Sequence, residues 1–349
     1  MNPWTGSEKK LEPFSYAAYR IAASVVAHPD IPADVRVFDE KGWTLENWVE
    51  GLMTYGPDVI GCSTYVWSLP TFHALLAEIR VRAPHVKTVL GGPSARPEML
   101  ALPPFRQAVH TVDALVVGEG EEAFTDLLLA WMRGGNARDV AGLAVPEGDV
   151  FVRTAKRPNI DDLTRLASPF QMGIAPMSVS AHLETFRGCP MSCMFCQWGV
   201  ADSRLTMTAD AIKQELLAFR AGGAKSVYLV DAGINLNQRA FRALRDAEAE
   251  VGFCKETRIQ CEVYPANITE EHTDFLKSVP SYVGMGLQSM DQSVLDGMQR
   301  PFQRRKFDAA VERLAEVTQQ LSISLIVGLP GDSPEQFKQT LAIARQYPV

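Results

Sequence analysis

The sequence has no long apolar run and no excess of basic residues. Its longest uncharged stretch, 59–77, is interrupted by several polar side chains, so we expect no membrane span. The amino terminus has no charged segment followed by an apolar core, which argues against a secretory signal. The formal net charge is -7, so no global basic field would attract a nucleic acid, and we expect none as a partner. We therefore expect a cytoplasmic protein.

Histidine pairs at metal-ligand spacing are also absent, as are short-period repeats and low-complexity segments. The composition of 46% hydrophobic and 21% charged residues is typical of a globular protein, which excludes disorder, collagen and coiled coil. The 349 residues are enough for two domains or for one large α/β domain.

Short apolar runs alternate with helical periodicity over the first third of the chain, which predicts an α/β fold. We interpret 1–135 as a doubly wound, Rossmann-like domain. Each strand ends in a turn with small residues, where open parallel sheets bind their ligands. The expected strands are 34–39, 58–66, 88–90 and 114–117, and the expected helices are 45–55, 70–82 and 121–132.

Turn-forming residues punctuate the next segment, so 136–177 is predicted to be a linker. A second βα series occupies 178–349, and its five regularly spaced units predict part of a (β/α)6 barrel. The series stops where a sixth strand would start, so we expect this domain to be incomplete at its carboxyl end. Its expected strands are 182–186, 226–230, 258–263, 282–287 and 322–327, and its expected helices are 209–221, 238–251, 270–278, 306–319 and 334–345.

Three cysteines crowd into eight residues after the first strand of the second series: Cys189, Cys193 and Cys196. In so long a chain this crowding suits a metal or cluster site better than a disulfide scaffold. Three thiolates on one loop can hold three irons of a cubane, and no fourth Cys or His lies nearby to close a tetrahedral site. A zinc site or incidental cysteines are the alternatives. The remaining cysteines are interpreted as small core residues: Cys62, Cys254 and Cys261.

The cysteine loop, with its Cys-x3-Cys-x-aromatic-Cys pattern, resembles that of the radical S-adenosylmethionine (radical SAM) superfamily. The resemblance covers about 178–349. It implies a [4Fe-4S] cluster on the three cysteines, whose open iron binds S-adenosyl-L-methionine (SAM) and whose electron cleaves it to a 5′-deoxyadenosyl radical. The three cysteines are then both metal ligands and catalytic residues.

The resemblance also implies contacts to SAM at the ends of the later strands. The loop after the second strand, DAGIN, lacks the usual Gly-Gly-Glu form, whereas IVGLPG at 326–331 matches the adenine motif of the fifth strand. Strand-end polar groups satisfied by nearby backbone are the alternative. The basic run 300–306 is either a solvated helix start or supplies an arginine to the SAM carboxylate. The candidate SAM-binding residues are Asp231, Asn235, Glu262, Gln288, Ile326 and Gly328.

The amino-terminal domain resembles the cobalamin-binding domain of cobalamin-dependent radical SAM enzymes, on the strength of 57–67, 91–93 and 117–122. Small residues at strand ends let a flat corrin approach the backbone, and a helix starting near 121 offers free amide groups. No Asp-x-His-x-x-Gly is present, so no histidine is nominated as the lower cobalt ligand. A flavodoxin-like domain without a cofactor is the alternative. The candidate cobalamin-binding residues are Ser63, Tyr65, Trp67, Gly91, Gly92, Gly118, Glu119 and Gly120.

Together the two resemblances imply an enzyme with a [4Fe-4S] cluster, SAM and cobalamin, most simply a methyltransferase acting on an unactivated carbon. Its expected partners are a small-molecule or peptide substrate and a low-potential electron donor of the flavodoxin or ferredoxin type. Cyclisation or rearrangement with the same cofactors, and a truncated fragment without turnover, are the alternatives. Methylthio transfer to RNA is disfavoured, because that family has three further cysteines in its first domain and only Cys62 is present here.

Overall fold

The computed structural model describes residues 14–176, 180–198 and 205–349, which form two compact units. The first comprises Phe14–Ile160 and Leu166–Ala175, and the second comprises Asp161–Arg165 and Pro176–Val349. The expected domain limits at 1 and at 177 and 178 fall outside the described residues. None of the helices described in either unit is long and apolar enough to cross a membrane.

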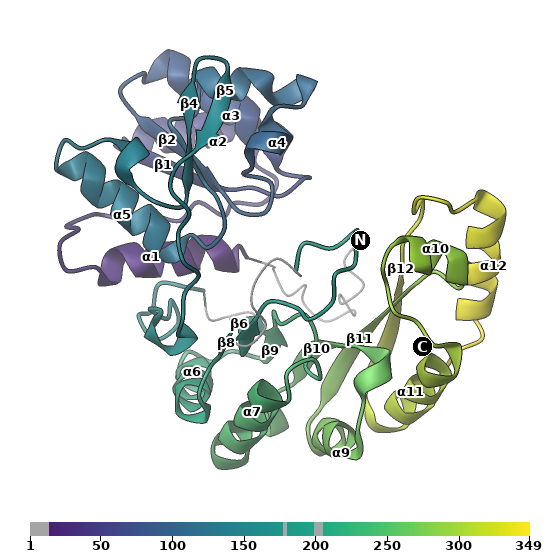
Figure 1. Cartoon of the computed structure of the whole chain (residues 1–349). Helices are drawn as coiled ribbons and strands as arrows, with labels where there is room; N and C mark the ends of the chain where they lie inside the picture. The colour runs from purple at the N-terminus through teal and green to yellow at the C-terminus, as the bar shows by residue number, and fades with distance from the viewer. Residues whose placement is uncertain (1–13, 177–179, 199–204) are drawn as a thin grey trace. The chain divides into compact units, whose positions relative to one another are not determined.

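The first unit is built on a five-stranded sheet of order β1-β2-β3-β4-β5 (Figure 1). β1, β2 and β3 are parallel, while β4 and β5 form an antiparallel hairpin on the far side of β3. The strands are β1 (Val59–Ser63), β2 (Lys87–Gly91), β3 (Ala114–Val116), β4 (Leu143–Glu147) and β5 (Val150–Arg153). The helices are α1 (Tyr16–Ala27), α2 (Leu45–Tyr55), α3 (Leu69–Arg82), α4 (Pro97–Leu100), η1 (Pro103–His110), α5 (Glu121–Met132) and η2 (Ala137–Asp139).

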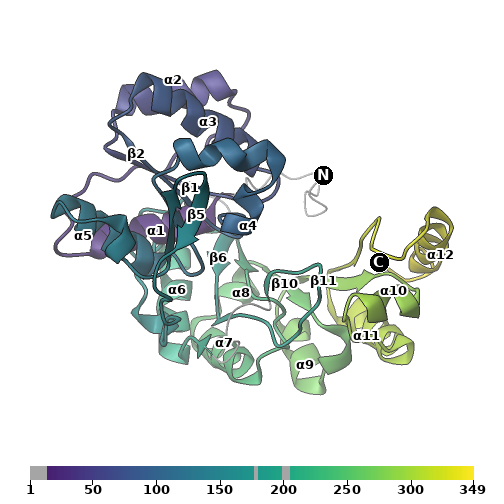
Figure 2. The same cartoon turned by 45° about the horizontal axis from the view of Figure 1, so that its top comes forward.

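Both faces of this sheet are buried, as expected for a doubly wound sheet. α2, α3 and η1 cover one face, and α5 and η2 cover the other, each over its own apolar cluster. Figure 2 shows α2 and α3 side by side on their face of the sheet. The α/β class predicted for this part of the chain is confirmed by the parallel sheet and its helical layers.

Two details of this unit differ from the sequence prediction. Residues 34–39 form no strand. The Asp34 carbonyl there accepts the Tyr55 hydroxyl of α2, and the Asp39 carboxylate accepts the Ser15 amide just before α1. The segment 136–177 was predicted to be a linker, but it contributes β4 and β5 to the sheet. The Gly148 turn, with a φ of 59°, is the tip of that hairpin.

The second unit is an open sheet of five parallel strands in the order β12-β11-β10-β9-β6. They are β6 (Ser180–Leu183), β9 (Ser226–Leu229), β10 (Ile259–Val263), β11 (Ser281–Gln288) and β12 (Gln320–Leu325). The helices α6, α7, α9 and α11 lie in a row along one face (Figure 1). Five βα units of the expected partial barrel are thus present.

The helices of this unit are α6 (Ala209–Ala221), α7 (Gln238–Val251), α8 (Phe253–Glu256), α9 (Glu270–Ser278), α10 (Gln292–Gly297), α11 (Arg304–Val317) and α12 (Pro334–Ala344), with short turns η3 (Leu163–Arg165) and η5 (Pro265–Asn267). Side-chain caps fix several helix starts, among them Thr208 before α6, Asn237 before α7 and Ser333 before α12. A two-stranded ribbon of β7 (Phe186–Arg187) and β8 (Leu205–Thr206) follows β6.

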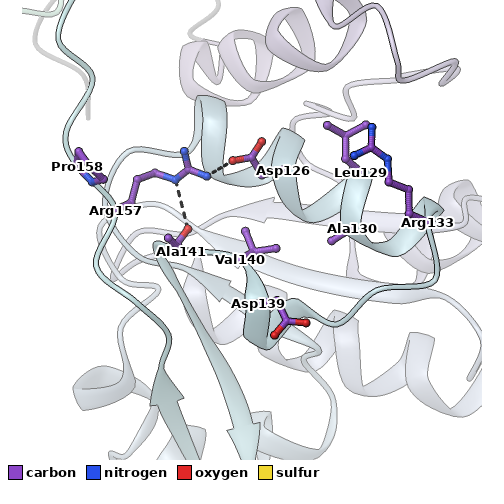
Figure 3. A pocket seen from close by; sticks show the side chains of 9 residues that line it. All are labelled: Asp126, Leu129, Ala130, Arg133, Asp139, Val140, Ala141, Arg157 and Pro158. Atoms are coloured by element: carbon purple, nitrogen blue, oxygen red, sulfur yellow. Dashed lines mark hydrogen bonds and ion pairs between the residues drawn. The ribbon is translucent and has the colours of Figure 1, made fainter.

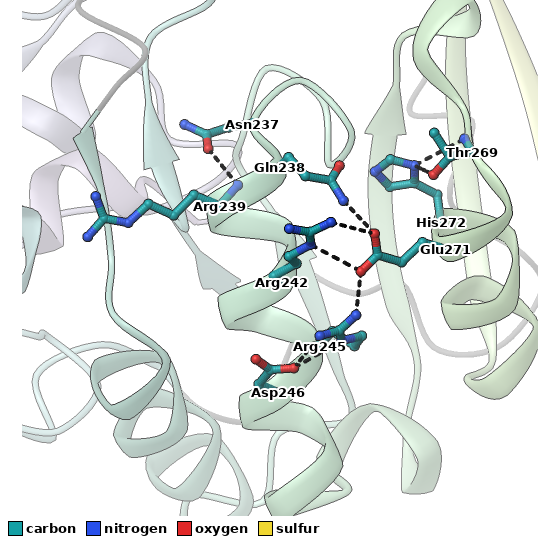
Figure 4. A network of polar contacts seen from close by, with 9 residues as sticks. All are labelled: Asn237, Gln238, Arg239, Arg242, Arg245, Asp246, Thr269, Glu271 and His272. Atoms are coloured by element: carbon teal, nitrogen blue, oxygen red, sulfur yellow. Dashed lines mark hydrogen bonds and ion pairs between the residues drawn. The ribbon is translucent and has the colours of Figure 1, made fainter.

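A network of charged side chains joins α7 to α9 on the outside of this unit (Figure 4). The Glu271 carboxylate accepts hydrogen bonds from Gln238, Arg242 and Arg245. All four side chains are partly or largely exposed, so each pair contributes little to stability.

Candidate functional site

The strand ends of the second unit are tied to one another by hydrogen bonds. The Ile234 amide donates to the Glu262 carbonyl at 2.8 Å, and the Ile326 amide donates to the Gln288 carbonyl at 3.0 Å. These bonds link the loops after β9 and β12 to β10 and β11. The carboxyl ends of parallel strands meet at one edge of a sheet, so the predicted site residues of this unit gather there.

The cysteine loop begins at a break in the first strand. β6 ends at Leu183, whose carbonyl accepts the Val230 amide at 2.9 Å, and the chain then leaves the parallel sheet. The expected single strand 182–186 is therefore two shorter strands, β6 and β7. The Arg187 guanidinium binds the Glu184 carboxylate through Nε at 2.8 Å and Nη2 at 2.9 Å, which fixes the start of the loop. Gly188 follows with a φ of 98°.

Within the loop, Cys193 is buried and Cys189 and Cys196 are partly exposed. The Cys196 amide donates to the Cys193 carbonyl at 3.0 Å, and the Met194 amide donates to the Met298 carbonyl at 3.0 Å. Burial and the nearby sulfurs of the other two cysteines raise the pKa of the Cys189 thiol, against the hydrogen bond from the Met191 amide. The three thiols therefore share one small volume.

No group of three His, Cys, Asp or Glu side chains converges on a single metal ion within the described ranges. A cubane takes one protein sulfur for each of three irons, and three thiols on one loop fit that group.

Asp231 lies directly after β9 and is fully buried. Its carboxylate accepts hydrogen bonds from the Thr185 amide at 2.8 Å, the Thr185 hydroxyl at 2.5 Å and the Phe186 amide at 3.3 Å. Burial raises the pKa of this carboxyl to about 7, although the three hydrogen bonds oppose the shift. Both oxygens are thus used to hold the backbone between β6 and the cysteine loop.

Asn235, in the same loop, is also buried and also engaged. Its Nδ2 donates to the Tyr264 carbonyl and its Oδ1 accepts the Tyr264 amide, so it extends β10 by one paired residue. The Tyr264 hydroxyl in turn donates to the Pro301 carbonyl at 2.7 Å. Asn235 therefore holds the backbone at the edge of the site.

Glu262 and Gln288 carry polar atoms that the protein leaves open. No described side chain bonds the Glu262 carboxylate, and burial raises its pKa to about 7. The Gln288 Oε1 is buried without a hydrogen-bond partner, on a residue with a φ of 69°. Buried polar atoms normally have partners, so these two are available to a bound polar molecule. This is the observation that fits SAM.

Two glycines of β11 make room for these side chains. A Cβ at Gly284 would overlap the Glu262 carboxylate, and a Cβ at Gly286 would overlap the Gln288 amide. Both glycines point to the same face of the sheet, because they are two residues apart on one strand. The Gly-x-Gly pattern at 284–286 is a further sequence signal of this site, because it leaves space over the strand for side chains from its neighbours.

The loop after β12 contacts the cysteine loop through an apolar cluster. Ile326 and Phe195 pack against Val294, Met298 and Leu329. The turn that follows contains Gly328 with a φ of 77° and Gly331 with a φ of 84°. The structure thus brings the predicted adenine motif and the cysteine loop together.

Arg300 also reaches the cysteine loop. Its Nη1 lies 3.9 Å from the Cys193 sulfur, and its Nη2 donates to the Gly286 carbonyl at 2.5 Å. Within the basic run 300–306, no sequence pattern separates Arg300 from its basic neighbours. Only the fold distinguishes it, since Arg304 binds Asp308 on the exposed side of α11 instead.

In the first unit, the predicted residues lie at the carboxyl ends of β1, β2 and β3. The Thr64 amide and hydroxyl both donate to the Gly91 carbonyl at 2.7 Å, which ties the first two strand ends together. A Cβ at Gly92 would lie 2.8 Å from the Thr64 carbonyl oxygen, so only glycine allows this approach. Ser63 is partly buried beside Gly92.

The loop after β1 carries two exposed apolar side chains. Trp67 is 74% exposed and stacks on Tyr65, with ring centroids 4.8 Å apart and planes 8° apart. Val66, between them, is 64% exposed. A flat apolar surface at a strand end, next to a glycine-lined edge, fits a large planar ligand such as a corrin.

The residues after β3 have structural tasks. The Glu119 carboxylate accepts the Ile160 amide at 2.6 Å. A Cβ at Gly120 would lie 2.9 Å from the Ile21 Cδ1, so this glycine lets α1 pack on α5. Gly118 is exposed, with a φ of 97°.

A surface groove of about 380 Å³ lies elsewhere in the first unit, along α5 and η2 (Figure 3). Arg157 crosses it to bind the Asp126 carboxylate and the Ala141 carbonyl. None of the predicted site residues lines this groove.

Comparison with known proteins identifies both units. A model of the radical SAM superfamily matches residues 183–344, and a model of the B12 binding domain matches residues 25–128.

Two curated proteins are similar to most of the chain. It is 29% identical over 308 residues to 2-(S-pantetheinyl)-carbapenam-3-carboxylate methyltransferase of Streptantibioticus cattleyicolor. It is 28% identical over 312 residues to the cobalamin-dependent radical SAM methyltransferase TokK of Streptomyces tokunonensis. Each match covers 81% of this chain and 44% of the relative, so the chain spans less than half the length of these proteins.

A solved structure shares the fold of the chain. The radical S-adenosylmethionine methyltransferase TsrM from Kitasatospora setae, with cobalamin and a [4Fe-4S] cluster bound, matches with a TM-score of 0.72 at 16% identity. The match covers 96% of this chain and 70% of that one.

Proposed function

Because the chain belongs to the family of cobalamin-dependent radical SAM enzymes, we propose that it is a methyltransferase acting on an unactivated carbon. The cofactors of this family are a [4Fe-4S] cluster, SAM and cobalamin. The observation that carries the proposal is the presence of a three-cysteine loop beside open polar strand ends, in a chain that also has a B12-binding unit. The cluster and SAM supply a carbon-centred radical, and cobalamin carries the methyl group.

The residues of the second unit that would contact the cofactors divide into three groups in this proposal. Cys189, Cys193 and Cys196 hold the cluster. Glu262 and Gln288 bind polar groups of SAM, because their buried oxygens have no partner in the protein. Ile326 and Gly328 line the adenine, with their backbone rather than with polar side chains.

Asp231 and Asn235 act through the backbone that they hold. Asp231 fixes Thr185 and Phe186 ahead of the cysteine loop, and Asn235 fixes Tyr264 beside it. Both side chains are buried, and both polar atoms of each already bind protein groups. We therefore assign both as positioning residues for the SAM site.

In the first unit, the corrin lies on the strand-end surface formed by Ser63, Gly91, Gly92 and Gly118. Tyr65 and Trp67 form the apolar platform, which supports a flat ring without coordinating cobalt. Glu119 and Gly120 support this surface without contacting the corrin. Glu119 accepts the Ile160 amide, and Gly120 leaves space for the Ile21 side chain.

We propose a small molecule or peptide as substrate, in keeping with the carbapenam-modifying relative, and no nucleic acid. A flavodoxin or ferredoxin supplies the electron. The proposed location is the cytoplasm, where thiol ligands stay reduced. Cyclisation or rearrangement with the same cofactors is the second candidate, and product mass separates the two because methylation adds one methyl group.

The test is anaerobic reconstitution with iron, sulfide and hydroxocobalamin, followed by desalting, metal analysis and a visible spectrum. We expect about four irons per chain and a retained corrin band. The Cys189→Ala, Cys193→Ala, Cys196→Ala triple variant loses the iron but keeps the corrin, whereas Trp67→Ala loses corrin but keeps iron. Cys62→Ala, which changes a buried cysteine of β1, is the control and keeps both. Iron that survives the triple change would refute the assignment.

A further inference from the structure

The guanidinium of Arg300 is fixed by contacts on three sides. Its Nη2 donates to the Gly286 carbonyl, and its carbon lies 5.7 Å from the Tyr264 ring centroid and 6.0 Å from that of Phe195. The register between β11 and β12 shifts next to Gly286, which is the kind of irregularity that redirects a backbone group toward a site.

The backbone around Arg300 is held as firmly as its side chain. The Arg300 amide donates to the Leu295 carbonyl at 2.9 Å, and the next carbonyl, of Pro301, accepts the Tyr264 hydroxyl. Met298, two residues earlier, accepts the amide of Met194 from the cysteine loop. Arg300 and the cysteine loop therefore form one connected assembly.

The charge of Arg300 has no carboxylate to balance it. Within the described ranges no Asp or Glu lies within ion-pair distance of its guanidinium, and its Nε is buried without an acceptor. The Cys193 sulfur, which can carry negative charge, lies 3.9 Å from Nη1. A partly buried cation needs such a counter-charge, because burial of an unpaired charge is costly.

We propose that Arg300 is a positioning residue of the cluster, which donates a hydrogen bond to the Cys193 thiolate and raises the reduction potential of the iron–sulfur group. This inference rests on the cluster ligation proposed above. The reduced cluster has one more negative charge than the oxidised cluster, so a fixed cation beside a ligand sulfur stabilises the reduced form. Hydrogen bonds to the sulfurs and local charge are known determinants of cluster potential.

The test compares the midpoint potentials of reconstituted wild-type protein, Arg300→Gln, Arg300→Lys and Arg305→Gln, without SAM. Arg305 is an exposed arginine on α11, so its loss removes the same charge where solvent screens it. We expect Arg300→Gln to lower the ratio of reduced to oxidised cluster at a fixed potential about tenfold, equal to about 59 mV for a one-electron couple. Arg305→Gln keeps the wild-type potential.

Arg300→Lys covers the case in which the glutamine variant fails to hold iron. Lysine keeps the charge. Its single ammonium cannot contact both the Gly286 carbonyl and the Cys193 sulfur, whereas the planar guanidinium of arginine contacts both. We expect the lysine variant to hold the cluster with a smaller shift in the same direction. If Arg300→Gln fails to hold iron, the potential of Arg300→Lys decides: a lowered potential supports the proposal, and a wild-type potential overturns it.

A wild-type potential in both Arg300 variants would overturn it. If SAM binding in equilibrium dialysis is then weaker as well, Arg300 is assigned to the SAM carboxylate instead. Failure of the wild-type chain to take up iron is a different result, because it would remove the proposed function itself.

Discussion

Asn235 and Tyr264 are joined by two hydrogen bonds: the Asn235 Nδ2 donates to the Tyr264 carbonyl at 2.7 Å, and the Tyr264 amide donates to Oδ1 at 2.8 Å. A side chain thereby replaces the next strand partner at the end of β10. The Tyr264 ring contacts Arg300, and its hydroxyl donates to the Pro301 carbonyl. The Asn235–Tyr264 pair therefore helps to position the segment that packs against the cysteine loop.

Replacing Asn235 by aspartate should destabilise the protein by about 3 kcal/mol, because a buried oxygen would then face the Tyr264 carbonyl. Urea unfolding measures the loss. The matched control is Asn237→Asp, two residues along, where the side chain caps α7 by accepting two amides and aspartate serves equally well. Equal losses in both variants would contradict the role given to Asn235.

Asp231→Ala should cost about 2–4 kcal/mol of unfolding free energy, since it leaves the Thr185 and Phe186 amides buried and unsatisfied. Asp231→Asn should cost less than about 1 kcal/mol, because its remaining oxygen still accepts a backbone amide. Iron retained after desalting should follow the same order. An alanine variant as stable as wild type would show that these bonds do not hold the loop.

Glu262 should make the cofactor-free protein less stable as the pH rises. Its pKa is about 7 in the folded state and 4.5 as the ordinary value, so between these values the unfolded chain ionises first and the native state loses stability. The loss is at most about 3 kcal/mol and is complete above pH 7. Glu262→Gln should remove it.

The measurement is urea unfolding of both proteins between pH 4 and 8. The difference in unfolding free energy should be near zero at pH 4 and should grow in favour of Glu262→Gln up to pH 7. Glu312→Gln, an exposed change on α11, should show no such trend. A difference independent of pH would rule out a shifted Glu262 carboxyl.

Gly284→Ala should destabilise the protein by about 1–3 kcal/mol, because the new methyl group overlaps the Glu262 carboxylate. Glu262→Ala should relieve most of this cost, and a double-mutant cycle by chemical denaturation measures the coupling. Gly297→Ala is the control, since nothing lies within 4 Å of the position of its added Cβ. Simple additivity of the two changes would mean that the glycine has another purpose.

Glu271→Gln should change the stability by no more than about 1 kcal/mol, although the residue has three partners in Figure 4, because the network is exposed. Thermal unfolding at low and high salt should show that even this difference shrinks as salt is added. A larger, salt-independent loss would indicate that the network is part of the α7 to α9 packing.

The sequence predicted the helices of the second unit well, because their signals are local. The limits of α6, α7 and α9 agree with the prediction to the residue, with Thr208 and Asn237 as caps ahead of the first two. The cysteine loop and the strand ends were found for the same reason: each is a short, continuous pattern.

The hairpin of β4 and β5 was missed because its turn resembles the other breaks in a segment rich in Gly and Pro. The run of β-branched and aromatic residues at the start of Val150–Arg153 was the available signal. Conversely, 34–39 alternates as a strand does, but no neighbouring strand pairs with it in the described structure.

The tasks of individual site residues could not be predicted, because they depend on partners far away in the chain. Asp231 and Asn235 lie in the loop that was predicted to contact SAM, yet their polar atoms bind residues 46 and 29 positions away. Arg300 contacts the Cys193 sulfur, although 107 positions separate the two residues in the sequence. Sequence periodicity and motif spacing do not reveal such long-range contacts, because these contacts form only when the strands are assembled into the sheet.

The break between β6 and β7 gives the protein an internal reporter. The Thr185 and Phe186 amides are protected by one carboxylate rather than by a strand ladder, so their hydrogen-exchange rates follow the state of Asp231. Exchange at these two amides would therefore register opening of the cysteine loop while the rest of the parallel sheet stays closed.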